Sequence, residues 1–192
     1  MFQFCLRLGD NDLILSQRLG EWCGHGPVLE EDLALANVAL DLLGQARLWL
    51  SLAAELEGRG RDEDQLAFLR DAGEFRNLLL VEQANGDYAA TLARQYYFDA
   101  WHALLLERLA LSSEARVAAI AAKAVFEVRY HLERSRDWII RLGDGTEESH
   151  ARIQAALDRL WPYTGEMFQA DGVDAPAGDL AALRTPWLDE LN

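Results

Sequence analysis

The chain has 192 residues, of which 51% are hydrophobic and 26% charged, a composition typical of a globular protein. Its formal net charge of −14 argues against nucleic-acid and anionic-membrane partners, which require clustered Lys and Arg side chains. The same charge suits a partner protein with a basic face, although acidity also serves solubility alone. The only two cysteines, Cys5 and Cys23, provide neither a disulfide framework nor a cysteine-based metal spacing.

Nothing in the first 60 residues indicates export or membrane insertion. The N-terminal stretch MFQFCLRLGDND introduces charge too early for the apolar core of a signal peptide. The longest apolar region, 33–56, contains Asp41, Arg47 and Glu55, so we do not expect it to span a membrane. We therefore predict a cytoplasmic protein.

Helical periodicity dominates the chain, and no sustained alternation of apolar and polar residues indicates a strand. The pattern predicts a first helix over 10–23 and a long second helix over 28–57. Asp62 and Gln65 predict a capping box for a short helix. A further helical segment is expected over 74–83.

Three long helices are predicted next, over 88–110, 113–142 and 146–168. Long helices joined by short turns pack as an antiparallel bundle. We therefore predict an all-α protein with a helical bundle over 1–170 and additional short helices. From Asp171 onward Gly, Pro and Asp loosen the pattern, so 171–192 is expected to be a loosely ordered tail.

The apolar pattern of the second helix also predicts a binding partner. Between residues 33 and 56 its apolar residues occupy nearly every angular position, and such a helix is usually buried on more than one side. Large apolar and aromatic side chains commonly anchor interfaces. Leu48, Trp49 and Leu52 are therefore the predicted docking patch.

Carboxylates and histidines near the middles of long helices raise the question of a di-iron site. Such sites take a Glu from each of two helices and a Glu-x-x-His from each of two others, and the i, i+3 spacing places both ligands on one face. The candidate ligands are Asp41, Gln45, Asp99, His102, Glu127 and His131. Each could instead pair with an arginine or face water, and Val128 stands where a required Glu would be. The residues alone predict a bundle with an incomplete site.

One formal Glu-x-x-His exists, from Glu147 to His150, at the start of the last long helix. Acidic residues there commonly complement the helix dipole, so we do not expect a ligand pair. The chain has no phosphate-binding glycine loop, no dinucleotide-binding motif and no nucleophile elbow.

Three stretches carry a resemblance to a known family. They are LRLGDNDLILSQRLGEWCGHGPVLEEDLALANVALDLLGQAR (6–47), NLLLVEQANGDYAATLARQYYFDAWH (77–102) and EVRYHLERSRDWIIRLGDGTE (127–147). They resemble the C subunits of bacterial phenylacetyl-CoA epoxidases, also called ring-1,2-phenylacetyl-CoA oxygenases. The similarity continues more weakly to residue 170, and family members run further, which implies that this chain is short after about residue 171.

The resemblance implies a ferritin-like bundle within a multicomponent monooxygenase that epoxidises the ring of phenylacetyl-CoA during aerobic phenylacetate degradation. A sister A subunit is then expected to hold the di-iron centre and the substrate, and a reductase component to supply electrons. This chain is expected to be a non-catalytic structural subunit that binds the A subunit and holds no cofactor itself. Self-association stays open.

The matching segments agree with that division of roles. The catalytic sister's Asp-Glu-x-Gly-His corresponds here to 41–45, with Leu42 in place of the Glu and Gln45 in place of the His. Its Glu-Glu-x-x-His corresponds to 127–131, with Val128 in place of the second Glu. A Leu or Val cannot balance the charge of an iron pair. The expected degenerate pseudo-site, without metal, comprises Asp41, Gln45, Asp99, Glu127 and His131.

The alternative hypothesis is an enzyme. In that case Asp99, Glu127 and His131 would supply a mono- or dinuclear site of a divergent metal-dependent oxidase. The small number of ligands favours the structural subunit.

Overall fold

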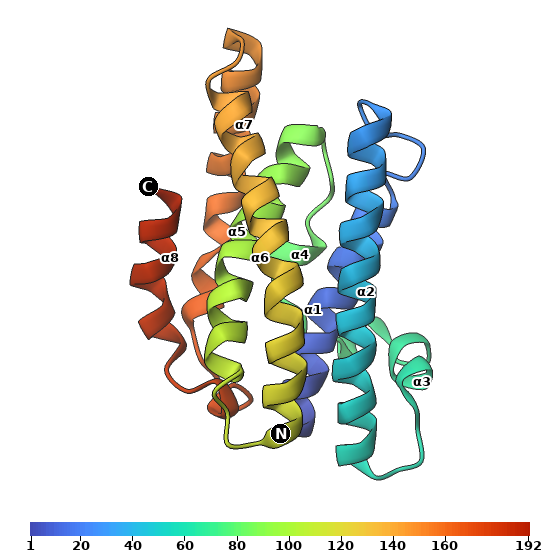
Figure 1. Cartoon of the computed structure of the whole chain (residues 1–192). Coiled ribbons are helices and arrows are strands. Elements are labelled where there is room, and N and C mark those ends of the chain that lie inside the picture. The colour runs from blue at the N-terminus through green and yellow to red at the C-terminus, as the bar shows by residue number, and fades with distance from the viewer. The chain divides into compact units, whose positions relative to one another are not determined.

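The computed structural model describes every residue from 1 to 192 (Figure 1). It consists of helices and connecting segments and has no strand, so the predicted all-α class is confirmed. The chain divides into two compact units. The first contains 1–82 and 172–176, and the second contains 83–171 and 177–192.

The first unit is organised around two long helices, α1 (Phe2–Gly20) and α2 (Leu29–Glu57), which pack along each other (Figure 1). Their short connection, 21–28, makes them antiparallel. The two helices approach closely at Gly9, where an added Cβ would lie 2.7 Å from the Leu50 side chain. The missing side chain therefore permits the close packing of α1 on α2.

Helix α1 begins at Phe2, so the prediction that it begins at residue 10 was wrong. The sequence GDND at 9–12 looks like a helix start, but it lies in the middle of α1 and is buried. The Asp10 carboxylate forms an ion pair with Arg70 and accepts a hydrogen bond from the Arg76 backbone N–H at 2.8 Å. These polar groups anchor a distant loop instead of capping a helix.

Helix α2 agrees with the predicted second helix, and it ends at Gly58, whose φ of 67° is left-handed. The predicted capping box is confirmed at α3 (Glu63–Phe68). The Asp62 carboxylate accepts from the Gln65 backbone N–H at 2.8 Å, and the Gln65 side chain accepts from the Asp62 N–H at 3.0 Å.

The helix predicted over 74–83 was wrong. The structure has a 3₁₀ turn, η1 (Ala72–Glu74), then an extended segment, and finally the single turn α4 (Leu79–Glu82). The backbone N–H of Leu78 donates to Asn11 Oδ1 of α1 at 2.7 Å. A backbone donor that a helix would use internally is therefore bound to a side chain far away in the sequence.

The second unit contains α5 (Tyr88–Leu109), α6 (Ala115–Gly143) and α7 (Glu147–Leu160). Helix α5 packs against both α6 and α7, and most of its side chains are buried. The Thr146 hydroxyl caps α7 by accepting from the Ser149 N–H at 3.1 Å. Helix α7 ends at residue 160 and not at 168, because Pro162 cannot donate a helical hydrogen bond.

Residues 171–192 were expected to form a loosely ordered tail. The structure gives them the segments η4 (Ala175–Ala177), η5 (Leu180–Leu183) and α8 (Arg184–Leu191). Trp187 of α8 is 1% exposed, and its Nε1 donates to the Tyr97 carbonyl at 3.0 Å. This aromatic residue attaches α8 to α5. The extent of a folding domain over 1–170 stays a prediction.

Helix α2 also has the length and hydropathy of a membrane-spanning helix, with a mean hydropathy of 1.2 over its most apolar window. Within the protein 44% of that window is buried. Core helices of globular proteins share these properties, so length and hydropathy alone are weak support for a membrane span.

Candidate functional site

A buried polar cluster lies where α5 packs against α6 in the second unit. Its centre is Asp99, whose side chain has no exposed surface. Asp99 Oδ1 accepts a hydrogen bond from Gln95 Nε2 at 2.6 Å, and Oδ2 accepts one from Ser135 Oγ at 3.0 Å. His102 and His131 are buried as well. We call these five residues the Asp99 cluster.

Burial decides the protonation of the Asp99 cluster. It raises the pKa of Asp99 to about 8, because the hydrogen bonds from Ser135 and Gln95 offset only part of the lost solvation. Burial, and secondarily the charge of His131, lowers the pKa of His102 to about 3. At neutral pH Asp99 is mostly a neutral acid and His102 a neutral ring. The centre of the cluster therefore consists of neutral hydrogen-bonding groups.

The residues present do not fit a di-iron centre. Val128 is fully buried on α6 and offers no donor atom, while Glu127 is only half-buried. Nowhere in the chain do three or more His, Cys, Asp or Glu side chains form a group that could hold a metal ion. Di-iron sites in bundles use about six protein ligands, several of them carboxylates. The Asp99 cluster offers a single buried carboxyl group.

The other two pseudo-site residues, Asp41 and Gln45, lie on α2 in the first unit. Gln45 is buried and Asp41 is half-buried. Leu42, where the resemblance implies a ligand Glu in the catalytic sister, has no exposed surface. Within the second unit, Asp99 contacts α6 through Ser135, one helical turn beyond His131.

Sequence reasoning missed two members of the cluster, Gln95 and Ser135, because it searched only for metal-ligand residue types. Gln95 lies four residues before Asp99, and Ser135 lies four after His131, so helical spacing was the available signal. The Glu147–His150 pair lies at the surface, where His150 Nδ1 is 2.8 Å from the Gly143 carbonyl oxygen.

The predicted docking patch of Leu48, Trp49 and Leu52 is wrong. Trp49 has no exposed surface and Leu52 is 5% exposed, so both belong to the core. The periodicity showed correctly that α2 is apolar on several sides. It could not show which of those sides other parts of the protein cover.

The apolar side chains that α2 does expose form a separate row. Leu29, Leu33, Leu40 and Leu43 are 70%, 56%, 64% and 45% exposed, respectively. Their spacing places them along one side of the helix. We call these four residues the α2 stripe.

A groove of about 530 Å³ continues the α2 stripe toward α3. It is lined by Leu40 and Leu43 of the stripe and by Phe68 of α3, whose side chain is 72% exposed. Arg47 Nε donates to Glu63 Oε1 at 3.1 Å and so connects α2 to α3. Mostly apolar lining with charges at the rim suits a protein partner.

Comparisons with known proteins agree with the resemblance. A family model for phenylacetic acid catabolic proteins matches residues 1–192. A curated relative from Escherichia coli (strain K12), the C subunit of a 1,2-phenylacetyl-CoA epoxidase, is 57% identical over 194 aligned positions, which cover 98% of this chain and 78% of the relative. The all-helical structure is consistent with the ferritin-like fold of this family. The chain belongs to the phenylacetic acid catabolic protein family.

Proposed function

We propose that this chain is the non-catalytic structural subunit of a cytoplasmic, multicomponent di-iron monooxygenase that epoxidises the ring of phenylacetyl-CoA. The observation that carries the proposal is the 57% identity to the C subunit of an epoxidase over 98% of the chain. In this proposal a catalytic A subunit holds the di-iron centre and the substrate, and a reductase component supplies electrons. This chain binds and stabilises the A subunit.

The chemistry of the buried residues supports a role without catalysis. Leu42 and Val128, at positions where a catalytic sister would carry Glu ligands, are both fully buried. Asp99 keeps a carboxyl group, but its two oxygens accept hydrogen bonds from Gln95 and Ser135. Two ferrous or ferric ions need anionic ligands to balance their charge, and Leu42 and Val128 supply none.

The α2 stripe and its groove are the surface that we assign to the A subunit. The first turn of α2 carries Glu30, Glu31 and Asp32, and α3 adds Glu63 and Asp64. Apolar side chains flanked by carboxylates fit a partner whose own apolar surface is flanked by basic residues. Permanent interfaces typically bury about 2,000 Å² or more, so the stripe would be the anchor of a larger contact.

Co-expression with the A subunit tests the proposal and separates it from the divergent oxidase. The complex is purified through a tag on the A subunit, the two chains are separated, and iron and manganese are measured in each. We expect a stable complex whose iron stays with the A subunit. Failure to form a complex, or two metal ions per copy of this chain with the optical band of an oxo-bridged pair, would contradict it.

A further inference from the structure

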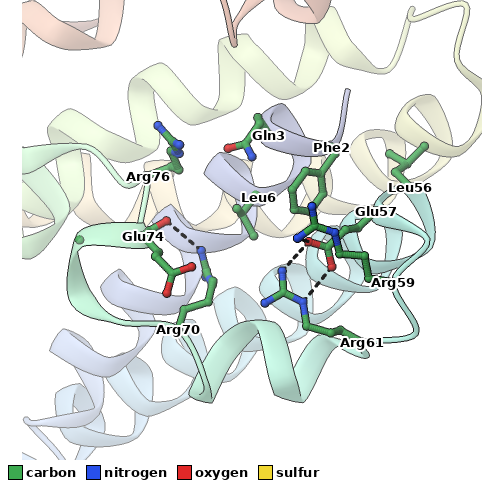
Figure 2. A pocket seen from close by; sticks show the side chains of 11 residues that line it. Phe2, Gln3, Leu6, Leu56, Glu57, Arg59, Arg61, Arg70, Glu74 and Arg76 are labelled. Atoms are coloured by element: carbon green, nitrogen blue, oxygen red, sulfur yellow. Dashed lines mark hydrogen bonds and ion pairs between the residues drawn. The ribbon is translucent and has the colours of Figure 1, made fainter.

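A second cavity of the first unit gathers arginine side chains (Figure 2). Its volume is about 500 Å³, and it lies among the start of α1, the end of α2 and the 70–76 segment. Four of the chain's 18 Lys and Arg residues line it: Arg59, Arg61, Arg70 and Arg76. We call this cavity the arginine pocket. In a chain of net charge −14, such a concentration of positive charge requires an explanation.

Two of the four arginines are already paired with carboxylates. The Arg70 side chain is 2% exposed and forms an ion pair with the fully buried Asp10. Arg61 Nε donates to Glu57 Oε2 at 2.8 Å, and its Nη2 donates to the other carboxylate oxygen. The hydrogen bond from Arg61 lowers the pKa of Glu57, so that carboxylate is ionised. These two pairs fix the wall of the pocket.

The other two arginines have weaker carboxylate contacts: Arg59 has one long ion pair and the Arg76 guanidinium has none. The Arg59 side chain is 76% exposed, and its nearest carboxylate oxygen, Glu57 Oε1, is 3.9 Å away and already bonded to Arg61. The Arg76 guanidinium forms no hydrogen bond and no ion pair, and only its backbone N–H is bonded. Nη1 of Arg61 also has no acceptor. Several N–H donors at this pocket are therefore available to a ligand.

The acidic residues of the lining, Glu57 and Glu74, cancel only part of this positive charge. Glu57 is paired with Arg61, and the Glu74 carboxylate accepts from the Asp71 backbone N–H at 2.8 Å. The guanidinium groups that line this cavity repel each other, and a bound anion would attract them and so offset that repulsion. Phe2, Leu6 and Leu56 add an apolar wall.

We propose that the arginine pocket binds the phosphate group of a small anionic ligand. Guanidinium groups present paired N–H donors that match phosphate oxygens, and the charged hydrogen bonds that result are among the stronger ones in proteins. The cavity volume lies within the range of small-molecule sites, about 300–1,000 Å³. Phe2 and Leu56 lie where an apolar part of the ligand would contact the protein.

Two sources offer this chemistry. One is free inorganic phosphate or pyrophosphate. The other is an organic phosphate such as coenzyme A, the carrier named in the substrate of the epoxidase relative. Only the second source depends on the proposed function, so the phosphate site and the epoxidase role can fail independently.

Isothermal titration calorimetry on the full chain tests the proposal. Inorganic phosphate, pyrophosphate and coenzyme A are titrated separately, with ionic strength held constant by chloride. The test variant combines Arg59→Gln with Arg76→Gln. Arg59 has only a long, exposed ion pair with Glu57 and the Arg76 guanidinium has none, so the fold should persist by circular dichroism. Arg152→Gln is the control, because Arg152 is an exposed arginine on α7 whose carboxylate partners, Glu148 and Asp87, lie outside the pocket.

We expect the wild-type protein to bind at least one phosphate compound. The double variant should bind about tenfold more weakly, which corresponds to one lost charge-assisted hydrogen bond, and the control should bind as wild type does. Tighter binding of coenzyme A than of pyrophosphate would identify an organic phosphate, and equal binding a free phosphate. Absence of binding at millimolar concentrations, or equal affinity of the double variant and wild type, would overturn the proposal.

Discussion

At the residue scale, the buried Asp99 links the stability of the protein to pH. In the unfolded chain an Asp releases its proton near pH 4, whereas the folded protein keeps it until about pH 8. Between these values the folded state binds one proton more than the unfolded state. The contribution of Asp99 to stability is therefore complete below pH 4 and is lost as the pH rises toward 8.

Asp99→Asn should remove this dependence, because the amide is neutral at every pH and retains an acceptor for Gln95. Ser135 Oγ also lies 3.2 Å from the Leu132 carbonyl oxygen, to which it could donate while accepting from the new amide. Urea unfolding of both proteins between about pH 5 and pH 8 measures the difference, whose limiting slope is about 1.4 kcal/mol per pH unit. His102 affects both proteins equally and cancels. Parallel pH profiles would show that Asp99 is ionised in the folded state.

The positions of Asp99, Glu127 and His131 near the middles of long helices predict that all three are largely buried. Asp99 and His131 are buried, whereas Glu127 is only half-buried. The sequence did not predict that the hydrogen-bond donors to the Asp99 carboxyl group would be neutral side chains. Gln95 and Ser135 are ordinary helix residues until the packing of α5 against α6 brings Ser135 to the carboxyl group. That packing depends on tertiary structure.

At the scale of elements, the packing of α1 on α2 depends on Gly9. Gly9→Ala would place a methyl group 2.7 Å from Leu50, which is 2% exposed and has little room to move. We expect a loss of about 1–3 kcal/mol in the free energy of unfolding. The control is Gly44→Ala on exposed α2 surface, where a Cβ meets nothing within 4 Å. It should stabilise the protein by about 0.5–1 kcal/mol, and equal unfolding midpoints for the two variants would contradict this account.

The long helices α2, α5 and α6 were predictable because their periodicity and end signals are local. The start of α1 and the segment 74–83 were not, for one shared reason. The side-chain oxygens of Asp10 and Asn11 accept hydrogen bonds from the backbone N–H groups of Arg76 and Leu78, more than 60 residues away. Reasoning from neighbouring residues places Asp and Asn at a helix start, where their side chains commonly bond to the nearby backbone. It cannot reveal a hydrogen-bond partner that lies far away in the sequence.

The α2 stripe should determine binding of the A subunit. Leu33→Glu combined with Leu40→Glu is expected to weaken co-purification, because both leucines are exposed and their charged replacements would be desolvated in the interface. Stability should change by no more than about 0.5 kcal/mol per exposed site. The matched control is Ile140→Glu on α6, at a residue 53% exposed.

Trp49→Glu distinguishes the stripe from the core. Trp49 is fully buried, so this change should unfold the protein and lower its helical content, unlike the stripe variants. If the stripe double variant co-purifies as well as wild type does, the A subunit binds elsewhere.

At the scale of the whole molecule, we expect the charge of −14 to act mainly on encounter with the proposed A subunit. Complementary fields raise association rates more than they raise affinity, and salt screens them. Stopped-flow mixing with the A subunit at increasing salt should therefore show slower association and a nearly constant dissociation rate. A dissociation rate that rises as steeply as the association rate falls would place the charges inside the contact.

In the proposed complex, this chain supports catalysis without performing it. The direct measurement is phenylacetyl-CoA epoxidation by the A subunit and its reductase, assayed with this chain, without it, and with this chain in place of the A subunit. The account predicts sustained turnover only when both subunits are present. Full and stable activity of the A subunit alone, or turnover by this chain without the A subunit, would contradict it.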